Sequence, residues 1–230
     1  MANRILVFYG SYRSDRLGVR LARFVVERLR RRGEDVELID AKEINLPILD
    51  RMYKEYRKGE APEPLERLAR KIIAADGFVF VTGEYNWGVQ PGLKNLTDHF
   101  LEEWFWRPAA IASYSAGRLS GVRAAIAWHG ILSEMGMVTI SSTISVGPMH
   151  KAYRLMASPL AKEVRRLNKP WRDLPMTWCG GWKRSKCSGN AKHHHTDRRS
   201  ASGWTRGRDH AVDRGGRHLT GTTRSYGRPF

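Results

Sequence analysis

The sequence predicts an α/β fold with a parallel β-sheet for its first 174 residues, and two observations support this prediction. Five short, almost continuous apolar runs are typical of strands buried in a parallel sheet. The segments between these runs carry apolar residues at helical spacing. Strands that alternate with helices build a parallel sheet that is covered on both faces. We therefore expect one domain over residues 1–174 and a tail over residues 175–230.

The first half of the domain is predicted to contain two strands and two helices. Residues 5–9 form an apolar strand that ends at Gly10, and residues 36–39 form the next strand. The helix between them has arginines in its last turns, where positive charge suits the helix dipole. Its apolar face consists of Leu17, Leu21, Phe24, Val25 and Leu29. After an irregular segment, Pro62 and Pro64 open the next helix, since proline is well tolerated in a first turn. Its apolar positions are Leu65, Leu68, Ala69, Ile72 and Ile73.

The second half is predicted to add three strands, over residues 78–82, 109–114 and 138–143. A helix over residues 92–103 connects the first two of these strands. A second helix, which ends before Gly136, connects the last two. Its apolar positions are Ala124, Ala125, Trp128, Ile131, Leu132 and Met135.

The tail differs from the domain in composition. The whole chain has a net charge of +17, and residues 175–230 carry 12 Lys and Arg against only 3 Asp and Glu. About half of the excess positive charge therefore lies in a quarter of the chain. The tail is also poor in large apolar residues, so it cannot bury enough apolar surface to offset the entropy lost on folding. We expect it to be irregular or disordered. Because the charge is concentrated there, we expect no nucleic-acid partner for the domain.

Other classes of protein are excluded by simple counts. No run of 18 apolar residues is present, so we expect no membrane span. The N-terminus lacks the pattern of a signal peptide, and we expect a cytoplasmic protein. Two cysteines, Cys179 and Cys187, are too few for a disulfide scaffold. They and the three histidines of residues 193–195 lack the paired spacing of zinc ligands, so we expect no metal site.

Ligands of open α/β sheets bind beyond the carboxyl ends of the strands, and the loop at residues 10–18 follows the first predicted strand. It leads into a helix N-terminus, where free N–H groups and the dipole favour an anion. Ser11 and Ser14 offer hydroxyl groups, and Arg13 and Arg16 can pair with phosphate. The loop matches neither the dinucleotide fingerprint nor the P-loop, so a monophosphate fits better.

Two further loops follow the third and fourth strands. Residues 82–92 combine exposed backbone, the aromatic side chains Tyr85 and Trp87, and amide groups, so a planar ring could lie against them. Residues 113–121 are rich in glycine and serine, which let the backbone approach a ligand closely. Three loops of this kind at three strand ends predict a ligand site more strongly than any one of them.

Each loop also has a plainer interpretation. The first could be an ordinary turn whose helix is capped by Ser14 or Asp15. The second could be a loop whose aromatic side chains pack locally. The third could supply a helix cap through Ser115 or Ser120.

At these loops the sequence resembles the NADPH-dependent FMN reductase family of flavodoxin-like flavoproteins. The resemblance covers roughly residues 3–174. It departs from the family at Gly83, where proline is common, and in the direct succession of Gly92 and Leu93. The matching motifs are Gly10-Ser11-x-Arg13, Glu84-Tyr85-Asn86, Pro91-Gly92-Leu93-Lys94-Asn95, Ser115-Ala116-Gly117 and Gly121-x-Arg123-Ala124.

The resemblance implies a doubly wound sheet of strand order 2-1-3-4-5 and a bound FMN. The FMN phosphate would be held by Ser11, Arg13 and Arg16, with Ser14 as a further hydroxyl candidate in the same loop. The isoalloxazine ring would be lined by Glu84, Tyr85, Asn86 and Trp87. The pyrimidine edge would be flanked by Ser115, Gly117 and Ser120.

The resemblance also implies an oxidoreductase that takes a hydride from NADPH or NADH through FMN. The acceptor would be a small molecule such as a quinone, a free flavin, an azo compound or a metal oxyanion. Because the cofactor supplies the chemistry, we expect no catalytic side chain. A homodimer or homotetramer is expected, with residues 95–106 as an interface helix. The alternative for its aromatic side chains is the core of one subunit.

Two other functions stay open at this point. The domain could be a flavodoxin-like electron carrier without a nicotinamide site, or the basic tail could bind nucleic acid. The tail has a further interpretation. Codons can be chosen for residues 176–190 that, read one nucleotide out of frame, encode an amphipathic helix. We therefore predict that a frameshift near Pro175 replaced a C-terminal helix.

Overall fold

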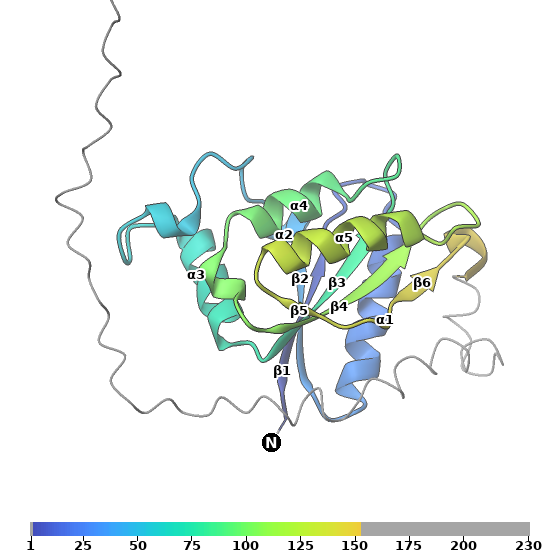
Figure 1. The fold of residues 1–230 in the computed structure, drawn as a ribbon, viewed down its shortest axis with the longest axis horizontal. Helices are drawn as coiled ribbons and strands as arrows, with labels where there is room; N and C mark the ends of the chain where they lie inside the picture. The colour runs from blue at the N-terminus through green and yellow to red at the C-terminus, as the bar shows by residue number, and fades with distance from the viewer. Residues whose placement is uncertain (1, 153–230) are drawn as a thin grey trace, which may run out of the picture. The chain divides into compact units, whose positions relative to one another are not determined.

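The sheet of this protein is parallel and has the strand order β2-β1-β3-β4-β5 (Figure 1). The structure is a computed structural model that describes residues 2–152. The four long strands are β1 (Arg4–Tyr9), β2 (Asp35–Asp40), β3 (Gly77–Gly83) and β4 (Pro108–Tyr114). This confirms the predicted α/β fold and its strand order. The domain boundary at residues 174 and 175, the tail and the frameshift hypothesis lie outside the described residues.

The fifth strand position is divided between two short strands. β5 (Val138–Thr139) pairs with the start of β4, and β6 (Ile144–Val146) pairs with its end. The prediction of one strand over residues 138–143 is therefore wrong in its extent. Residues 141–143 all carry hydroxyl groups and are at least partly exposed. Placing them in the sheet would therefore bury little apolar surface. The apolar residues Ile144 and Val146 resume the pairing.

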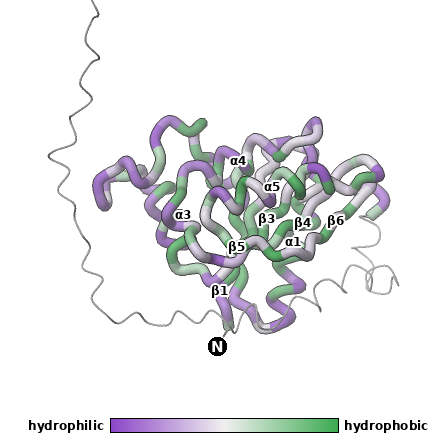
Figure 2. The backbone as a smooth tube through the Cα atoms, viewed as in Figure 1, coloured by the Kyte–Doolittle hydropathy of each residue, from purple (hydrophilic) through white to green (hydrophobic). Residues whose placement is uncertain are grey.

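Helices cover both faces of the sheet, as expected from strands that are apolar on both sides. α1 (Gly18–Arg30) packs on the face formed by Ile5, Val7 and Tyr9 of β1. The opposite face, which includes Leu6 and Phe8, is covered by α3 (Glu63–Ala74), α4 (Pro91–Asp98) and α5 (Val122–Glu134). The short elements are α2 (Ala41–Ile44), η1 (Tyr53–Glu55) and η2 (Glu102–Trp104). Figure 2 shows the hydrophobic residues concentrated along the central strands.

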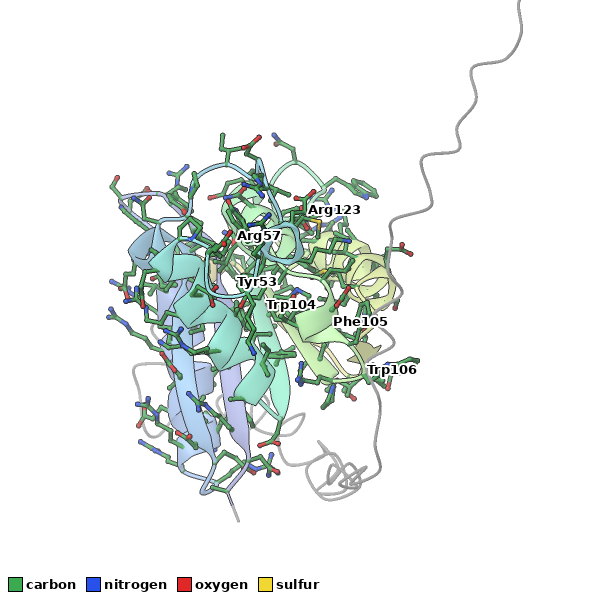
Figure 3. All side chains as sticks on the ribbon, turned by 90° about the vertical axis from the view of Figure 1, so that its left-hand side faces the viewer. Tyr53, Arg57, Trp104, Phe105, Trp106 and Arg123 are labelled. Atoms are coloured by element: carbon green, nitrogen blue, oxygen red, sulfur yellow. The ribbon has the colours of Figure 1, made fainter. Side chains whose placement is uncertain are left out.

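The segment from Asn95 to Trp106 does not form the predicted interface helix. α4 ends at Asp98, and the chain then turns through η2. Phe100 and Trp104 are buried in the core of the subunit, and the Trp104 indole donates hydrogen bonds to the carbonyls of Thr97 and Phe100 at 3.3 and 3.1 Å. Burial of these rings inside the subunit is the alternative left open by the sequence. Trp106, in contrast, is 68% exposed and lies at the periphery (Figure 3).

Within residues 2–152, no helix has the length and apolar character needed to cross a membrane. The same residues contain no group of three or more histidine, cysteine or acidic side chains arranged to hold a metal ion.

Candidate functional site

A cavity of about 470 Å³ lies beyond the carboxyl ends of β1, β3 and β4. All three loops singled out in the sequence contribute to it, because parallel strands bring their carboxyl ends to one edge of the sheet. Its lining residues are Ser11, Arg13, Asp15, Arg16, Leu17, Gly83, Glu84, Tyr85, Asn86, Tyr114, Ser115, Ala116 and Met149.

Close backbone packing fixes the first loop. A Cβ atom on Gly10 would lie 2.1 Å from the Cβ of Leu93 and 2.3 Å from its backbone, so only glycine fits between β1 and α4. The loop then delivers the chain to α1, whose N-cap residue Leu17 makes no side-chain capping bond. The interpretation of Ser14 or Asp15 as a helix cap is therefore wrong. The first turn of α1 keeps its N–H groups free of a side-chain cap beside the cavity.

The two arginines of this loop differ in their surroundings. Arg16 pairs with the buried carboxylate of Asp40 at 2.5 Å and donates to the carbonyl of Ser11 at 3.1 Å. Arg13 makes a two-pronged pair with Asp15, both distances being 2.9 Å, and both side chains are exposed. The hydrogen bonds from Arg13 hold the pKa of Asp15 below its ordinary value.

The second loop is a tight hairpin. Tyr85 and Gly88 exchange backbone hydrogen bonds at 3.0 and 2.9 Å, and the two residues between them, Asn86 and Trp87, both have positive φ angles. This is the backbone pattern of a two-residue hairpin turn. The turn directs the hydroxyl of Tyr85 to within 3.4 Å of the Ser11 hydroxyl, which connects the first loop with the second.

An ion pair with a buried carboxylate anchors the start of this hairpin. The side chain of Glu84 is 5% exposed and pairs with Arg123 of α5, whose guanidinium lies 4.6 Å from the centre of the Trp87 ring. One carboxylate oxygen of Glu84, Oε2, is buried and has no partner among the described residues. Trp87 thus packs locally on Arg123, which agrees with the plainer interpretation of that one side chain.

The third loop is held to β6 and to the segment that follows it. The N–H of Ser115 donates to the carbonyl of Val146, and the N–H of Met149 donates to the carbonyl of Ser115. α5 begins after Gly121, whose positive φ of 79° requires glycine, and no side chain caps it. The interpretation of Ser115 or Ser120 as a helix cap is therefore wrong.

Seven of the eleven predicted site residues line the cavity. They are Ser11, Arg13, Arg16, Glu84, Tyr85, Asn86 and Ser115. Four others, Ser14, Trp87, Gly117 and Ser120, lie in the same loops but are not among its lining residues. The predicted roles of all eleven in FMN binding stay predictions.

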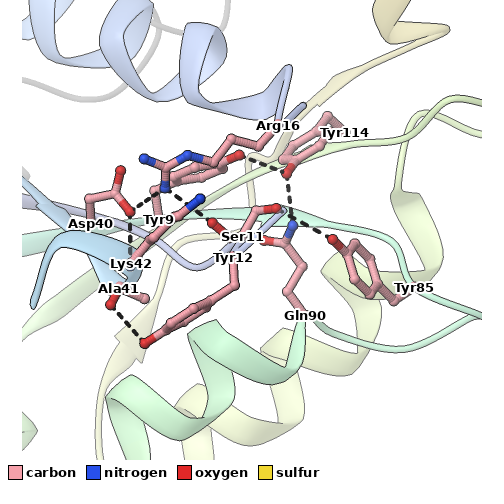
Figure 4. Close-up of polar contacts among 10 residues, drawn as sticks. All are labelled: Tyr9, Ser11, Tyr12, Arg16, Asp40, Ala41, Lys42, Tyr85, Gln90 and Tyr114. Carbon is pink, nitrogen blue, oxygen red and sulfur yellow. Dashed lines mark hydrogen bonds and ion pairs between the residues drawn. The ribbon is translucent and has the colours of Figure 1, made fainter. Parts of the chain in front are cut away.

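Tyr114 is the main lining residue that the sequence analysis missed. Its ring fills the space left by two glycines, because a Cβ on Gly18 or Gly83 would lie within 2.0 or 2.8 Å of it. Its hydroxyl accepts a hydrogen bond from Gln90 at 2.8 Å and donates to Tyr9 at 3.4 Å (Figure 4). Its position at the end of an apolar strand, directly before the glycine-rich loop, was the available signal.

The burial of Tyr114 should make the free energy of unfolding depend on pH in the alkaline range. Burial, followed by the nearby Tyr9 hydroxyl, raises the pKa of Tyr114 above the ordinary value of 10.0. Above about pH 10 the unfolded chain loses this proton and the folded chain keeps it, so the free energy of unfolding falls as pH rises. We expect Tyr114→Phe to make this fall less steep. Urea unfolding at about pH 9 and about pH 11 measures both slopes, and equal slopes in the two proteins would contradict the prediction.

Comparison with known proteins places the chain in a family. Residues 3–151 match the family of NADPH-dependent FMN reductases. An NAD(P)H-dependent FMN reductase of Schizosaccharomyces pombe is 39% identical over 122 residues, which are 48% of this chain and 57% of that protein. A quinone reductase of Escherichia coli K12 is 39% identical over 66 residues, which are 27% of this chain and 35% of that protein. The chain thus covers less than two thirds of the length of either relative.

A solved structure shares the fold. It is a flavoenzyme NAD(P)H:acceptor oxidoreductase of Paracoccus denitrificans, with a TM-score of 0.54 and 21% identity. The match covers 67% of this chain and 91% of that one, and at this identity it supports the fold alone. The family match extends over well over half of the chain and includes all three loops around the cavity. The chain therefore belongs to the NADPH-dependent FMN reductase family.

Proposed function

We propose that this protein is an FMN-dependent oxidoreductase that uses NADPH or NADH to reduce a small acceptor. The observation that supports this most strongly is the cavity at three neighbouring strand ends, which combines an anion-binding end with an aromatic and backbone-rich end. Its volume of about 470 Å³ is within the range of small-molecule and cofactor sites.

The anion-binding end fits the phosphate of FMN. The backbone N–H groups of Tyr12, Arg13 and Ser14 donate to no described residue. The N-terminus of α1 follows at Gly18, and Ser11, Arg13 and Arg16 add a hydroxyl and two guanidinium groups. Free N–H groups in a loop that leads into a helix N-terminus, together with arginine, are common surroundings of a protein-bound phosphate.

The other end fits a planar ring that carries hydrogen-bonding edges. Gly83 and the hairpin that starts at Glu84 present backbone, and Tyr85 and Asn86 present an aromatic ring and an amide. The unpaired buried oxygen of Glu84 is an acceptor that a ring N–H could satisfy. The residues present are therefore compatible with the isoalloxazine of FMN.

The chain's own residues bind and orient the reactants in this proposal. When bound, FMN supplies the redox chemistry by accepting a hydride from the nicotinamide and passing electrons to the acceptor. Tyr114 lines the cavity with a phenol that is protonated at neutral pH, since burial raises its pKa further above the ordinary value of 10.0. It can therefore act there as a neutral polar group. We propose no catalytic acid or base among the side chains.

For the electron acceptor we propose a chemical class and not a single compound. The relatives include an FMN reductase and a quinone reductase, so free flavin and quinones are the first acceptors to test, followed by azo compounds and metal oxyanions. A homodimer or homotetramer is proposed as the working assembly, and sedimentation of the purified protein tests it.

Steady-state turnover tests the proposed function. Protein supplied with FMN is expected to oxidise NADPH or NADH when a water-soluble quinone is present, with the rate proportional to protein concentration. An electron carrier of the same fold would bind FMN and show no such oxidation. FMN binding without oxidation of NADPH or NADH would therefore contradict the reductase and support the electron carrier.

A further inference from the structure

Two arginine–aspartate pairs with opposite surroundings lie at the anion-binding end of the cavity. In the Arg16–Asp40 pair, the side chains are 15% and 0% exposed. In the Arg13–Asp15 pair, they are 63% and 69% exposed. Both arginines and Asp15 line the cavity, whereas Asp40 is not among its lining residues. A ligand in the cavity can therefore contact the carboxylate of Asp15, whereas the carboxylate of Asp40 lies outside the cavity lining.

Asp40 lies behind the guanidinium of Arg16 and holds it in one orientation. Its Oδ1 accepts from Arg16 Nη1 at 2.5 Å and from the N–H of Lys42 at 3.1 Å (Figure 4). The same Nη1 donates to the carbonyl of Ser11 at 3.1 Å, and the guanidinium carbon lies 5.6 Å from the centre of the Tyr9 ring. Three partners thus fix this side chain.

Part of the Arg16 guanidinium remains available to a ligand. Its Nε and Nη2 atoms donate to no acceptor among the described residues, and the side chain lines the cavity. A guanidinium fixed on one side by a buried carboxylate can donate its other N–H groups to a phosphate without a further loss of rotamer freedom.

Asp15 lies on the cavity side and occupies the hydrogen-bonding fork of Arg13. Its two carboxylate oxygens accept from Nε and Nη2 at 2.9 Å each. This is the two-pronged geometry with which arginine binds a phosphate. A phosphate that uses the same fork has to displace Asp15.

We propose that Asp40 is a positioning residue for the phosphate of the cofactor, acting through Arg16, and that Asp15 competes with that phosphate for Arg13. The inference rests on the proposed function, since it assumes that FMN occupies the cavity. The negative charge of Asp40 also repels a phosphate. Positioning outweighs this repulsion, because without Asp40 the guanidinium would lose its buried counter-charge and would be free to turn toward solvent.

The test compares the affinities of FMN and riboflavin, which differ only by the phosphate. Asp40→Asn keeps the shape and the Oδ1 acceptor for Lys42, so it removes mainly the charge. We expect it to weaken FMN binding by about threefold to tenfold and to leave riboflavin binding unchanged. Asp15→Asn is expected to tighten FMN binding by about twofold to fivefold, again without an effect on riboflavin. Asp35→Asn, at an exposed position on the same strand as Asp40, is the matched control and should change neither affinity.

Flavin fluorescence titrations of the wild-type chain and the variants decide between the outcomes. Equal weakening of both flavins by Asp40→Asn would show a merely structural role, and unchanged or tighter FMN binding would exclude positioning. If the Asp40→Asn variant does not fold, Arg16→Lys is tested in its place. This substitution keeps the positive charge and removes the guanidinium group. A loss confined to FMN is then expected, and an unchanged ratio of the two affinities overturns the inference. A wild-type chain that binds FMN no more tightly than riboflavin would contradict the proposed phosphate site itself.

Discussion

Replacing Trp104 by alanine is expected to destabilise the domain by about 3–5 kcal/mol, the usual cost of truncating a large aromatic residue in a core. Trp104 is completely buried, and its ring contacts those of Phe78 and Phe8 at centroid distances of 5.0 and 5.3 Å. The change removes these contacts and leaves a cavity between the sheet and α3. Urea unfolding followed by circular dichroism measures the loss. Because a domain of this size is stabilised by only about 5–15 kcal/mol, the variant should unfold at much lower urea concentration.

Trp106→Ala is the matched control for this prediction. Trp106 is separated from Trp104 by one residue but is 68% exposed, so its removal should change stability by less than about 0.5 kcal/mol. Similar losses in the two variants would mean that Trp104 is not part of the core. That result would also reopen the interpretation of residues 95–106 as an interface element.

Gly10→Ala is expected to weaken FMN binding by about tenfold or more and to destabilise the domain by about 3 kcal/mol. The new Cβ would lie 2.1–2.3 Å from the Cβ, Cα and N atoms of Leu93. Leu93 is completely buried in α4, so the strain cannot be relieved by a side-chain rotation. The loop must move away from α4, and it carries Ser11 and Arg13 with it. Titration with FMN and urea unfolding measure the two effects.

Gly130→Ala provides the comparison for Gly10. Gly130 lies in α5, where an added Cβ would meet nothing within 4 Å, and alanine is the better helix former. We expect a gain of about 0.5–1 kcal/mol in the free energy of unfolding and no change in FMN affinity. Full FMN affinity in Gly10→Ala would show that the spacing between β1 and α4 does not set the site.

The strands and the edge that carries the site could be predicted because they depend on local patterns. β1, β3 and β4 contain nearly continuous apolar runs, and each is followed by a loop rich in small and polar residues. Parallel strands place such loops on one edge, so the approximate location of the cavity followed from the sequence alone. The fifth strand was harder, because its two halves are separated by residues without a clear apolar pattern.

The partners of the site residues could not be predicted, since they depend on which strands are neighbours. Asp40 pairs with Arg16 because β2 lies beside β1, in a register that places Asp40 opposite Tyr9. Arg123 reaches Glu84 from a helix 39 positions further along the chain. The sequence alone predicts Trp104 in an interface helix, because no local pattern shows that the chain turns inward after Asp98. In each case, the decisive contact is between residues that are distant in sequence.

Equilibrium titration of the purified, folded chain with FMN shows whether the cavity is a flavin site. We predict saturable binding of one FMN per chain, with quenching of flavin fluorescence and a shifted visible spectrum. FMN should bind more tightly than riboflavin. Circular dichroism of the same sample shows that the domain is folded. A folded chain that leaves the fluorescence and the spectrum of FMN unchanged would contradict the assignment of the cavity as a flavin site.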